Sequence, residues 1–392
     1  MVVNEMRLNQ SKQKKRRRRI LLVAVIGVFF LLVLALNQSG PRQEAGKSKT
    51  TSKKTSTKAT FKDSKKFRDN GNRPTYVQGP LVNQMDQELK SNGFKGSVLV
   101  VKNGQIVLNR AYGKANQSGD KNKITTTYPL ASITKNITGV MLVKVLHDHG
   151  YNFETKVSKF YPNLPHADTV TVKDLVDMTS GYTVDRFSQK NLSEEAYIND
   201  VVKRSTYQPQ YGENGKWRYS AANYMIVSGI LRKLSHKSYD ELLAEYIQPY
   251  YHVENNPQFL SNSHRPVAYK LDGQHPIDAP KAAFYSEVGT GNTYATPYTY
   301  YKVLTDEING KLISKAQFRA LTHPIPGKQY AGGVYTFQSN NAYGGHGTLV
   351  GFESSYRISQ DGKTGIFLFS NQMSQPANEA LTIRYFNDLM KP

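Results

Sequence analysis

Ser132 and Lys135, in the run Ala131-Ser132-Ile133-Thr134-Lys135, could together perform covalent chemistry. A serine hydroxyl is a weak nucleophile until a nearby base takes its proton, and a lysine amine partly shielded from water can be that base. Residues three apart on a helix share one face, so the amine can reach the hydroxyl. The pair indicates acyl transfer through a serine, with no metal and no cofactor required.

The spacing alone is not specific, because residues 11–14 and 118–121 also place a serine three positions before a lysine. Ser132 differs in context, since apolar residues recur at three- and four-residue intervals over 133–150 and predict a helix that begins at Ser132. A helix N-terminus directs N–H groups and partial positive charge toward a developing oxyanion. The alternative interpretation is that Ser132 only caps this helix and that Lys135 is solvated.

Tyr219 is a second residue with suitable chemistry, because a phenolate stabilised by a lysine is a competent base. It lies in the run Trp217-Arg218-Tyr219-Ser220, just before an apolar segment that predicts another helix. With 26 tyrosines in the chain, an ordinary packed tyrosine is the alternative.

These motifs, in order along the chain, are Ser132-x-x-Lys135, a Tyr-Ser dipeptide at Tyr219 and a Gly-His-Gly run at 345–347. The set resembles the serine β-lactamase and penicillin-binding-protein superfamily, in particular its class C β-lactamase, D-Ala-D-Ala carboxypeptidase and esterase branch. The resemblance covers about residues 75–389. It implies that Ser132 is the nucleophile and that Lys135 and Tyr219 move its proton.

The second motif departs from the family's Tyr-x-Asn pattern, because its third position is Ala221 and Asn223 comes two residues late. In the family that asparagine holds the amide carbonyl of the substrate. The resemblance therefore does not carry β-lactam or peptide binding over to this chain.

The third motif, normally Lys/His-x-Gly, has two possible registers. If His346 takes the first place, Thr348 replaces the glycine. If Gly351-Phe352 fixes the register, Gly345 comes first, His346 second, and Gly347-Thr348 match the usual Gly-Thr. We favour the second register, because it keeps the glycine that lets substrate approach the strand. A consequence of this register is that no cation occupies the first position.

In this second register the backbone N–H groups of Ser132 and Thr348 would form the oxyanion hole. A literal Lys-Thr-Gly at 363–365 is the competing match. It directly follows the turn Asp361-Gly362 and leaves room for only one strand and a helix, whereas the family motif requires two further strands. We interpret Lys363 as a turn residue.

The periodicity predicts an α/β (α+β) fold, with strands near both chain ends and short helices over 151–295. The resemblance implies a β-lactamase/transpeptidase-like sandwich: an antiparallel sheet built from both chain ends, flanked by helices, with a helical subdomain that carries Tyr219. The expected elements are helices over 81–89 and 377–390 and strands over 96–101, 105–108, 351–358 and 366–369, with Asn103-Gly104 and Asp361-Gly362 as turns.

The N-terminal part divides into a basic segment (1–19), a run of 17 apolar or small residues (20–36) and a Lys/Ser/Thr-rich linker (37–74), ahead of the hydrolase domain (75–392). The apolar run is near the lower limit for a transmembrane helix, and the positive-inside rule keeps residues 1–19 in the cytoplasm. A signal anchor in the cell membrane and an extracellular domain are expected, with a cleaved signal peptide as the alternative. The linker has too few large apolar residues to fold.

Charge is concentrated in this N-terminal part, because residues 1–75 hold 19 Lys/Arg and 4 Asp/Glu within a chain of net charge +22. This distribution argues against nucleic-acid binding. The basic linker fits anionic lipid head groups or wall polymers, with a merely solvated spacer as the alternative. The chain lacks cysteine, which excludes disulfides and thiolate metal sites and points to a Gram-positive bacterium. Its histidines show no metal-ligand spacing.

The sequence thus predicts a membrane-anchored serine hydrolase that forms an acyl-enzyme on envelope substrates bearing D-alanine. These are teichoic acid D-alanyl esters or peptidoglycan stem peptides, and the loss of the motif asparagine favours the ester. The alternatives are a non-catalytic relative that binds wall polymer or a partner and, third, a β-lactamase.

Overall fold

The computed structural model describes residues 79–213, 215–372 and 378–391. The basic segment, the apolar run and the linker predicted over 1–74 lie outside these residues, so their assignments stay predictions. Within the described residues, no helix is both long enough and apolar enough to cross a bilayer.

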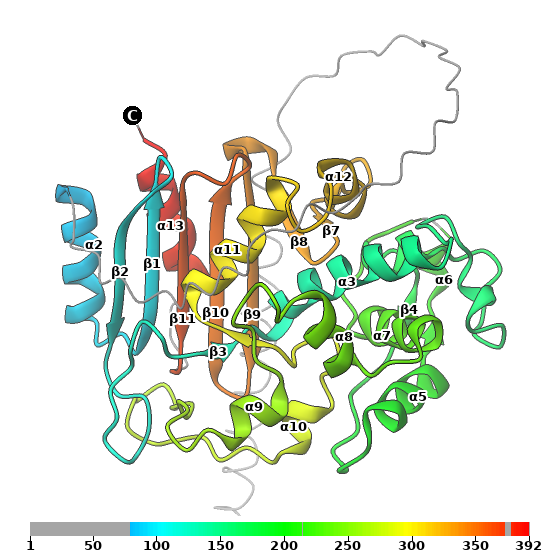
Figure 1. Ribbon diagram of the computed structural model, residues 1–392, viewed down its shortest axis with the longest axis horizontal. Helices are drawn as coiled ribbons and strands as arrows, with labels where there is room; N and C mark the ends of the chain where they lie inside the picture. Colours follow the sequence, from blue (N-terminus) through cyan, green and yellow to red (C-terminus); the bar gives the residue numbers. More distant parts are fainter. Residues whose placement is uncertain (1–78, 214, 373–377, 392) are drawn as a thin grey trace, which may run out of the picture. The chain divides into compact units, whose positions relative to one another are not determined.

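The central feature is a seven-stranded antiparallel sheet with the strand order β2-β1-β11-β10-β9-β8-β7. Strands from the beginning of the chain, cyan in Figure 1, lie directly beside strands from its end, in orange. Gly96 in β1 pairs with Ser370 in β11, which confirms that both chain ends build one sheet. The strands are β1 (Gly96–Lys102), β2 (Gln105–Tyr112), β7 (Tyr330–Ala331), β8 (Val334–Phe337), β9 (Ala342–Leu349), β10 (Phe352–Ser359) and β11 (Gly365–Ser370).

Local sequence explains the edges and the centre of this sheet. Asn103 and Gly104 both have positive φ, as a type I′ turn requires, and they join β1 to β2. All residues of β10 and β11 are buried, because these strands lie in the interior of the sheet and are covered on both faces. The short strands β7 and β8, which the sequence did not predict, extend the opposite edge.

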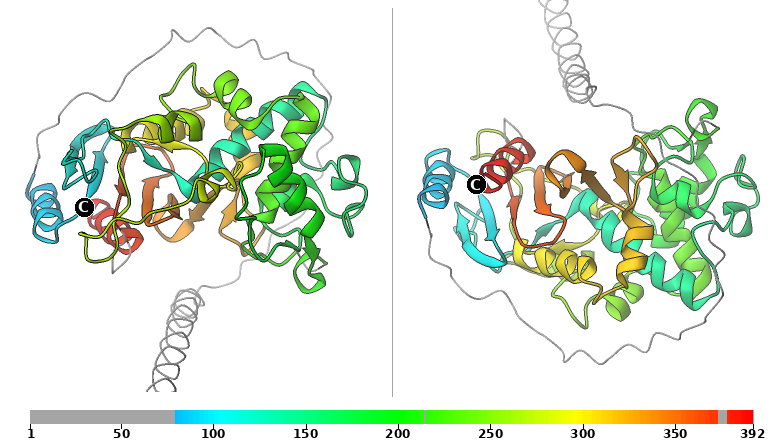
Figure 2. Two further views of the ribbon diagram at one scale, coloured as in Figure 1. Left: turned by 90° about the horizontal axis from the view of Figure 1, so that it is seen from below. Right: turned by 90° about the horizontal axis from the view of Figure 1, so that it is seen from above.

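Helices cover both faces of the sheet (Figures 1 and 2). On one face, α2 (Pro80–Ser91) and α13 (Asn378–Leu389) pack against a small apolar cluster that includes Val98, Leu368 and Phe386. On the other, α11 (Pro297–Ile308) and α3 (Thr134–Asp148) share the main core. The predicted sandwich is therefore confirmed.

The remaining helices form the predicted helical subdomain beside the sheet and the segments that connect it. Their bounds are η2 (Val157–Lys159), α4 (Val172–Val176), α5 (Glu194–Arg204), α6 (Pro209–Gly212), α7 (Ala222–Ser235), α8 (Tyr239–Tyr246), α9 (Asn256–Ser261), α10 (Ala282–Tyr285), α12 (Lys315–Thr322) and η3 (Gln338–Asn340). Two small pairings, β3 (Tyr128–Pro129) with β6 (Tyr294–Ala295) and β4 (Tyr182–Thr183) with β5 (Thr206–Tyr207), complete the fold.

Helix α3 lies in the centre, and it differs from the expected amphipathic helix. Every residue from Thr134 to Val143 is buried, including Lys135 and Asn136. The sheet and α11 cover one side of α3 and the helical subdomain covers the other, so no face is left for solvent. Its polar residues are paired internally, as when the Asn136 amide donates to Glu307 at 2.9 Å.

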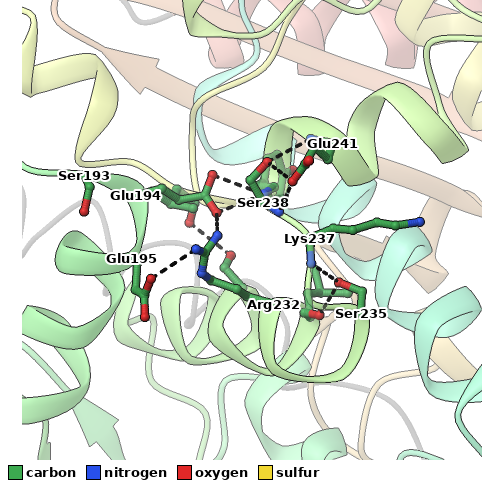
Figure 3. Close-up of polar contacts among 12 residues, drawn as sticks. Ser193, Glu194, Glu195, Arg232, Ser235, Lys237, Ser238 and Glu241 are labelled. Carbon is green, nitrogen blue, oxygen red and sulfur yellow. Dashed lines mark hydrogen bonds and ion pairs between the residues drawn. The ribbon is translucent and has the colours of Figure 1, made fainter.

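A polar cluster joins three helices of the subdomain, as Figure 3 shows. The Arg232 guanidinium of α7 donates to Glu194 at 3.3 Å and to Glu195 at 3.1 Å, both in α5. The Glu194 carboxylate also accepts the backbone N–H of Tyr239 at the start of α8, at 2.9 Å. The Glu194 carboxylate therefore fixes the relative positions of α5, α7 and α8. Ser238, the residue before α8, caps that helix.

We expect Arg232→Met to lower the free energy of unfolding by about 1 kcal/mol, because it removes both ion pairs but keeps most of the aliphatic packing. Urea unfolding followed by circular dichroism measures this. Lys203→Met, which replaces an exposed cation of α5 that has no ion pair among the described residues, is the matched control. Equal stability of the two variants would contradict this role for the cluster.

Candidate active site

Ser132 lies at the point where the chain enters α3. It occupies a single 3₁₀ turn, η1 (Ala131–Ile133), and the α-helix itself begins at Thr134, two residues later than the sequence predicted. Ala131 has a φ of +47°, a left-handed conformation that is uncommon for a residue with a side chain and that is concentrated at functional sites. The strained turn leaves Ser132 partly exposed while both of its neighbours are buried.

Two side chains converge on the Ser132 hydroxyl. The Lys135 amine lies 3.1 Å from Ser132 Oγ, and the Tyr219 hydroxyl lies 2.7 Å from the same atom. Lys135 is 2% exposed, whereas Tyr219 is 39% exposed. The Ser132 hydroxyl therefore contacts a buried amine, that of Lys135, and the hydroxyl of a partly solvent-exposed tyrosine, Tyr219.

The Lys135 amine has a second partner, the backbone carbonyl of Thr290, at 2.9 Å. This carbonyl is in place because the segment before Ser132 pairs with the segment after Thr290, through β3 and β6. The Leu130 N–H also donates to the Thr293 carbonyl at 2.9 Å. The pairing leaves the amine bound to two oxygens, the Thr290 carbonyl and Ser132 Oγ.

Tyr219 belongs to an aromatic cluster that holds its ring. Trp217 and Tyr330 lie 6.4 and 6.3 Å from it between ring centroids, and the Lys135 amine lies 5.3 Å from the centroid of the Tyr219 ring. The preceding residue, Arg218, donates its backbone N–H to Met178 in the helical subdomain. Tyr219 is thus carried by the subdomain and Ser132 by the junction of the sheet with α3.

Asn223 does not take the place of the missing motif asparagine. It is 1% exposed; its side-chain oxygen accepts the Ser180 hydroxyl at 2.5 Å and its amide donates to the Ser220 carbonyl at 3.0 Å. Both ends of the amide are therefore used inside the protein. Ala221, at the motif position itself, offers only a methyl group.

Strand β9 brings the third motif to Ser132, and Gly347 is the residue that faces it. A Cβ atom built on Gly347 would lie 2.7 Å from the Ser132 nitrogen and 2.5 Å from the Leu130 carbonyl oxygen. Only a glycine allows the strand to approach this closely. Thr348, the next residue, is exposed.

His346 points away from Ser132, because successive side chains of a strand lie on opposite faces. Its ring contacts Glu353 at 3.1 Å and Glu379 of α13 at 3.7 Å, on the other face of the sheet. Burial opposes protonation of His346, but the hydrogen bond to Glu353 and the two carboxylates raise its pKa. As a predicted site residue His346 can contribute only its backbone.

Gly345 lies on the same face as Gly347, in the place where the family has a cation. A Cβ atom there would lie 2.5 Å from the ring of Tyr356, which is directly opposite on β10. The buried tyrosine fills the space that a longer side chain would need. Lys363, the competing match, lies in the turn before β11, where its N–H donates to Asp361.

Two residues of the site carry no recognisable sequence signal. Thr290 acts through its backbone carbonyl, which any residue could supply. Glu287 lies one turn earlier and accepts the Thr290 hydroxyl at 2.5 Å. Neither could be found before the pairing of β3 with β6 was known.

Comparisons with known proteins agree with this architecture. A model of the family described as Beta-lactamase matches residues 81–387, so the chain belongs to the β-lactamase family, a family of serine hydrolases. The chain is 26% identical over 291 residues to the putative penicillin-binding protein PbpX of Bacillus subtilis (strain 168). The match covers 72% of each chain.

Solved structures show the same fold. FmtA from Staphylococcus aureus superimposes with a TM-score of 0.69 and 23% identity, over 82% of this chain and 92% of FmtA. The D-amino acid amidase from Ochrobactrum anthropi SV3 superimposes with a TM-score of 0.62 and 15% identity, over 79% and 98% of the two chains. The predicted resemblance to this superfamily is thereby confirmed.

We expect Gly347→Ala to slow labelling of Ser132 by a fluorophosphonate about 100-fold, because its methyl group would displace the strand from the Ser132 backbone. Labelling rates measured by gel fluorescence test this, with thermal unfolding to verify folding. Gly344→Ala is the matched control on the opposite face of β9, where the new methyl meets the side chains of Arg357 and Phe337 and not the backbone beside Ser132. Equal labelling rates for the two variants would show that the close approach is not needed.

Proposed function

We propose that the chain is a serine hydrolase that forms an acyl-enzyme on Ser132 and releases D-alanine from esters of cell-envelope polymers, foremost teichoic acid. The observation that carries the proposal is the hydrogen-bonded series Lys135–Ser132–Tyr219, with distances of 3.1 and 2.7 Å. Such a series supplies the nucleophile, a base and a proton relay.

In the proposed reaction Ser132 Oγ attacks the ester carbonyl carbon while its proton moves to the neutral Lys135 amine. The carbonyl oxygen becomes an oxyanion, for which the backbone N–H groups of Ser132 and Thr348 are the proposed donors. As the bond to the alcohol breaks, the proton passes through the Tyr219 hydroxyl to the leaving oxygen. Water then attacks the acyl-enzyme, gives up a proton along the same path and restores the Ser132 hydroxyl.

Two features support an ester rather than a peptide or a penicillin. Ala221 offers no hydrogen bond to an amide, and Asn223 is engaged elsewhere. A peptide that ends in D-alanine and a penicillin both carry a carboxylate, and Gly345 provides no cation to pair with it. A D-alanyl ester has no free carboxylate, so it requires neither contact.

The proposed location is the outer face of the cell membrane. The basic segment 1–19 and the apolar run 20–36 support a signal anchor, and the basic linker 37–74 would favour anionic wall polymers. Envelope polymers would then be within reach of the hydrolase domain.

We expect Tyr219→Phe to reduce ester hydrolysis by about 100-fold or more, because it removes the hydroxyl bonded to Ser132 Oγ. Its melting temperature should stay close to that of the wild type, since the side chain is partly exposed. Tyr250→Phe, at another exposed tyrosine, is the matched control and should leave kcat/KM unchanged. Full activity of Tyr219→Phe would exclude the relay.

The substrate class is tested with D-alanyl glycerol, a peptide ending in D-Ala-D-Ala, a fluorescent penicillin and a fluorophosphonate. We expect Ser132-dependent D-alanine release from the ester and a fluorophosphonate adduct, with much slower peptide cleavage and penicillin labelling. Ser132→Ala should abolish every signal. Absence of any Ser132-dependent adduct would overturn the enzyme assignment and favour a binding protein, and efficient peptide cleavage would overturn the ester preference.

A further inference from the structure

Glu287 places a carboxylate beside the proposed base. It lies before Gly289, whose carbonyl accepts the Thr138 hydroxyl of α3 at 2.7 Å, and near Thr290, whose carbonyl accepts the Lys135 amine at 2.9 Å. The backbone carbonyl of Glu287 accepts the N–H groups of Thr290 and Gly291 at 3.0 and 2.9 Å. The turn that carries the carboxylate is therefore fixed to α3 and to itself.

One carboxylate oxygen of Glu287 is used and the other is open. Oε2 accepts the Thr290 hydroxyl at 2.5 Å. Among the described residues, the other oxygen has no hydrogen bond, and no ion pair joins the carboxylate to Lys135. Gly291 packs closely against the same group, since a Cβ atom there would lie 3.2 Å from Oε2. A rigid, partly buried carboxylate thus lies next to the site with an unused acceptor.

Lys135 does not balance the charge of this group before it takes the Ser132 proton in the proposed reaction. Burial raises the pKa of Glu287, whereas the Lys135 charge and the Thr290 hydroxyl favour its ionised form. When Lys135 is the neutral base, that charge is absent, and a partly buried carboxylate without a nearby cation is unfavourable. A cation brought by the substrate would restore the balance.

We propose that Glu287 is a specificity residue whose free carboxylate oxygen binds the protonated α-amine of an aminoacyl ester. The inference rests on the proposed esterase function and names the part of the acyl group that is recognised. In such an ester the α-nitrogen is one bond from the carbon next to the ester carbonyl. It therefore lies close to the carbonyl that Ser132 Oγ attacks. Glu287 is connected to Ser132 by consecutive hydrogen-bond contacts through Thr290 and Lys135.

The same charge pattern accounts for what is excluded. The site has a carboxylate at Glu287 and no cationic side chain at Gly345, so it complements an acyl group with a positive charge and no negative one. An N-acylated amino acid, as in a peptide, has lost the positive charge and would leave Glu287 unpaired.

The test compares the glycerol esters of D-alanine, N-acetyl-D-alanine and propionic acid, with each rate divided by the rate of alkaline hydrolysis. For the wild type we expect kcat/KM for D-alanine to exceed that for the other two by about 10- to 100-fold. Glu287→Gln should reduce this ratio to within about 3-fold, because kcat/KM should fall for the D-alanine ester and stay unchanged for the other two esters. Glu154→Gln is the matched control, because Glu154 is an exposed glutamate far from Glu287 in the sequence.

A wild type without amine preference, or a Glu287→Gln variant that loses all three esters equally, would overturn the inference while leaving the esterase intact. Absence of Ser132-dependent hydrolysis of every ester would overturn the proposed function itself. A second measurement does not depend on folding of a variant: D-alaninamide should inhibit wild-type hydrolysis of the propionyl ester, and propionamide should not. Equal inhibition by the two amides would count against Glu287 as the amine site.

Discussion

The amine of Lys135 is held almost entirely out of water, and the geometry around Ser132 follows from the way this burial is compensated. A buried amine requires hydrogen-bond acceptors, and here they are Ser132 Oγ and the Thr290 carbonyl. The Thr290 carbonyl is available only because β6 pairs with β3 in the antiparallel direction. Strand β3 lies directly before the strained turn at Ala131. The proposed nucleophile, the proposed base and the pairing segment therefore form one structural unit.

In the proposed function, substrate selection depends on side chains that are small or turned away from Ser132. Gly347 lets β9 approach the Ser132 backbone, and Gly345 leaves its space to the ring of Tyr356. His346 contacts carboxylates on the far face of the sheet. The Glu287 carboxylate is a charged group close to Lys135, and in the proposed function it favours a positively charged acyl group over a negatively charged one.

Local sequence patterns predicted the elements that depend on local interactions. The Asn103-Gly104 turn, the strands near both chain ends and the helix after Ser132 follow from turn chemistry and apolar periodicity. The short strands β7 and β8 were missed, because two- and four-residue strands flanking Gly332-Gly333 show no measurable alternation.

Features of the site that depend on distant pairings could not be predicted. Two registers of the third motif were compatible with the sequence, and only the alternation of β9 against β10 shows which residues face Ser132. Thr290 contributes a backbone oxygen, so its residue type carries no information. Glu287 becomes relevant only because β6 lies beside β3. The burial of α3 from Thr134 to Val143 likewise reflects elements packed on it from far along the chain.

The strand order has a consequence for the order of events during synthesis. Strand β11 lies between β1 and β10. Strand β1, which contains Gly96, therefore pairs with β11 only after Ser370 has been synthesised. Such non-local contacts form slowly, because the long intervening loop must first be closed. A growing chain would already contain Ser132, Lys135 and Tyr219 without the strand that seats Gly347 against them. Assembly of the candidate active site is therefore expected late in folding, because it requires strand β9 and the strands that pair with it.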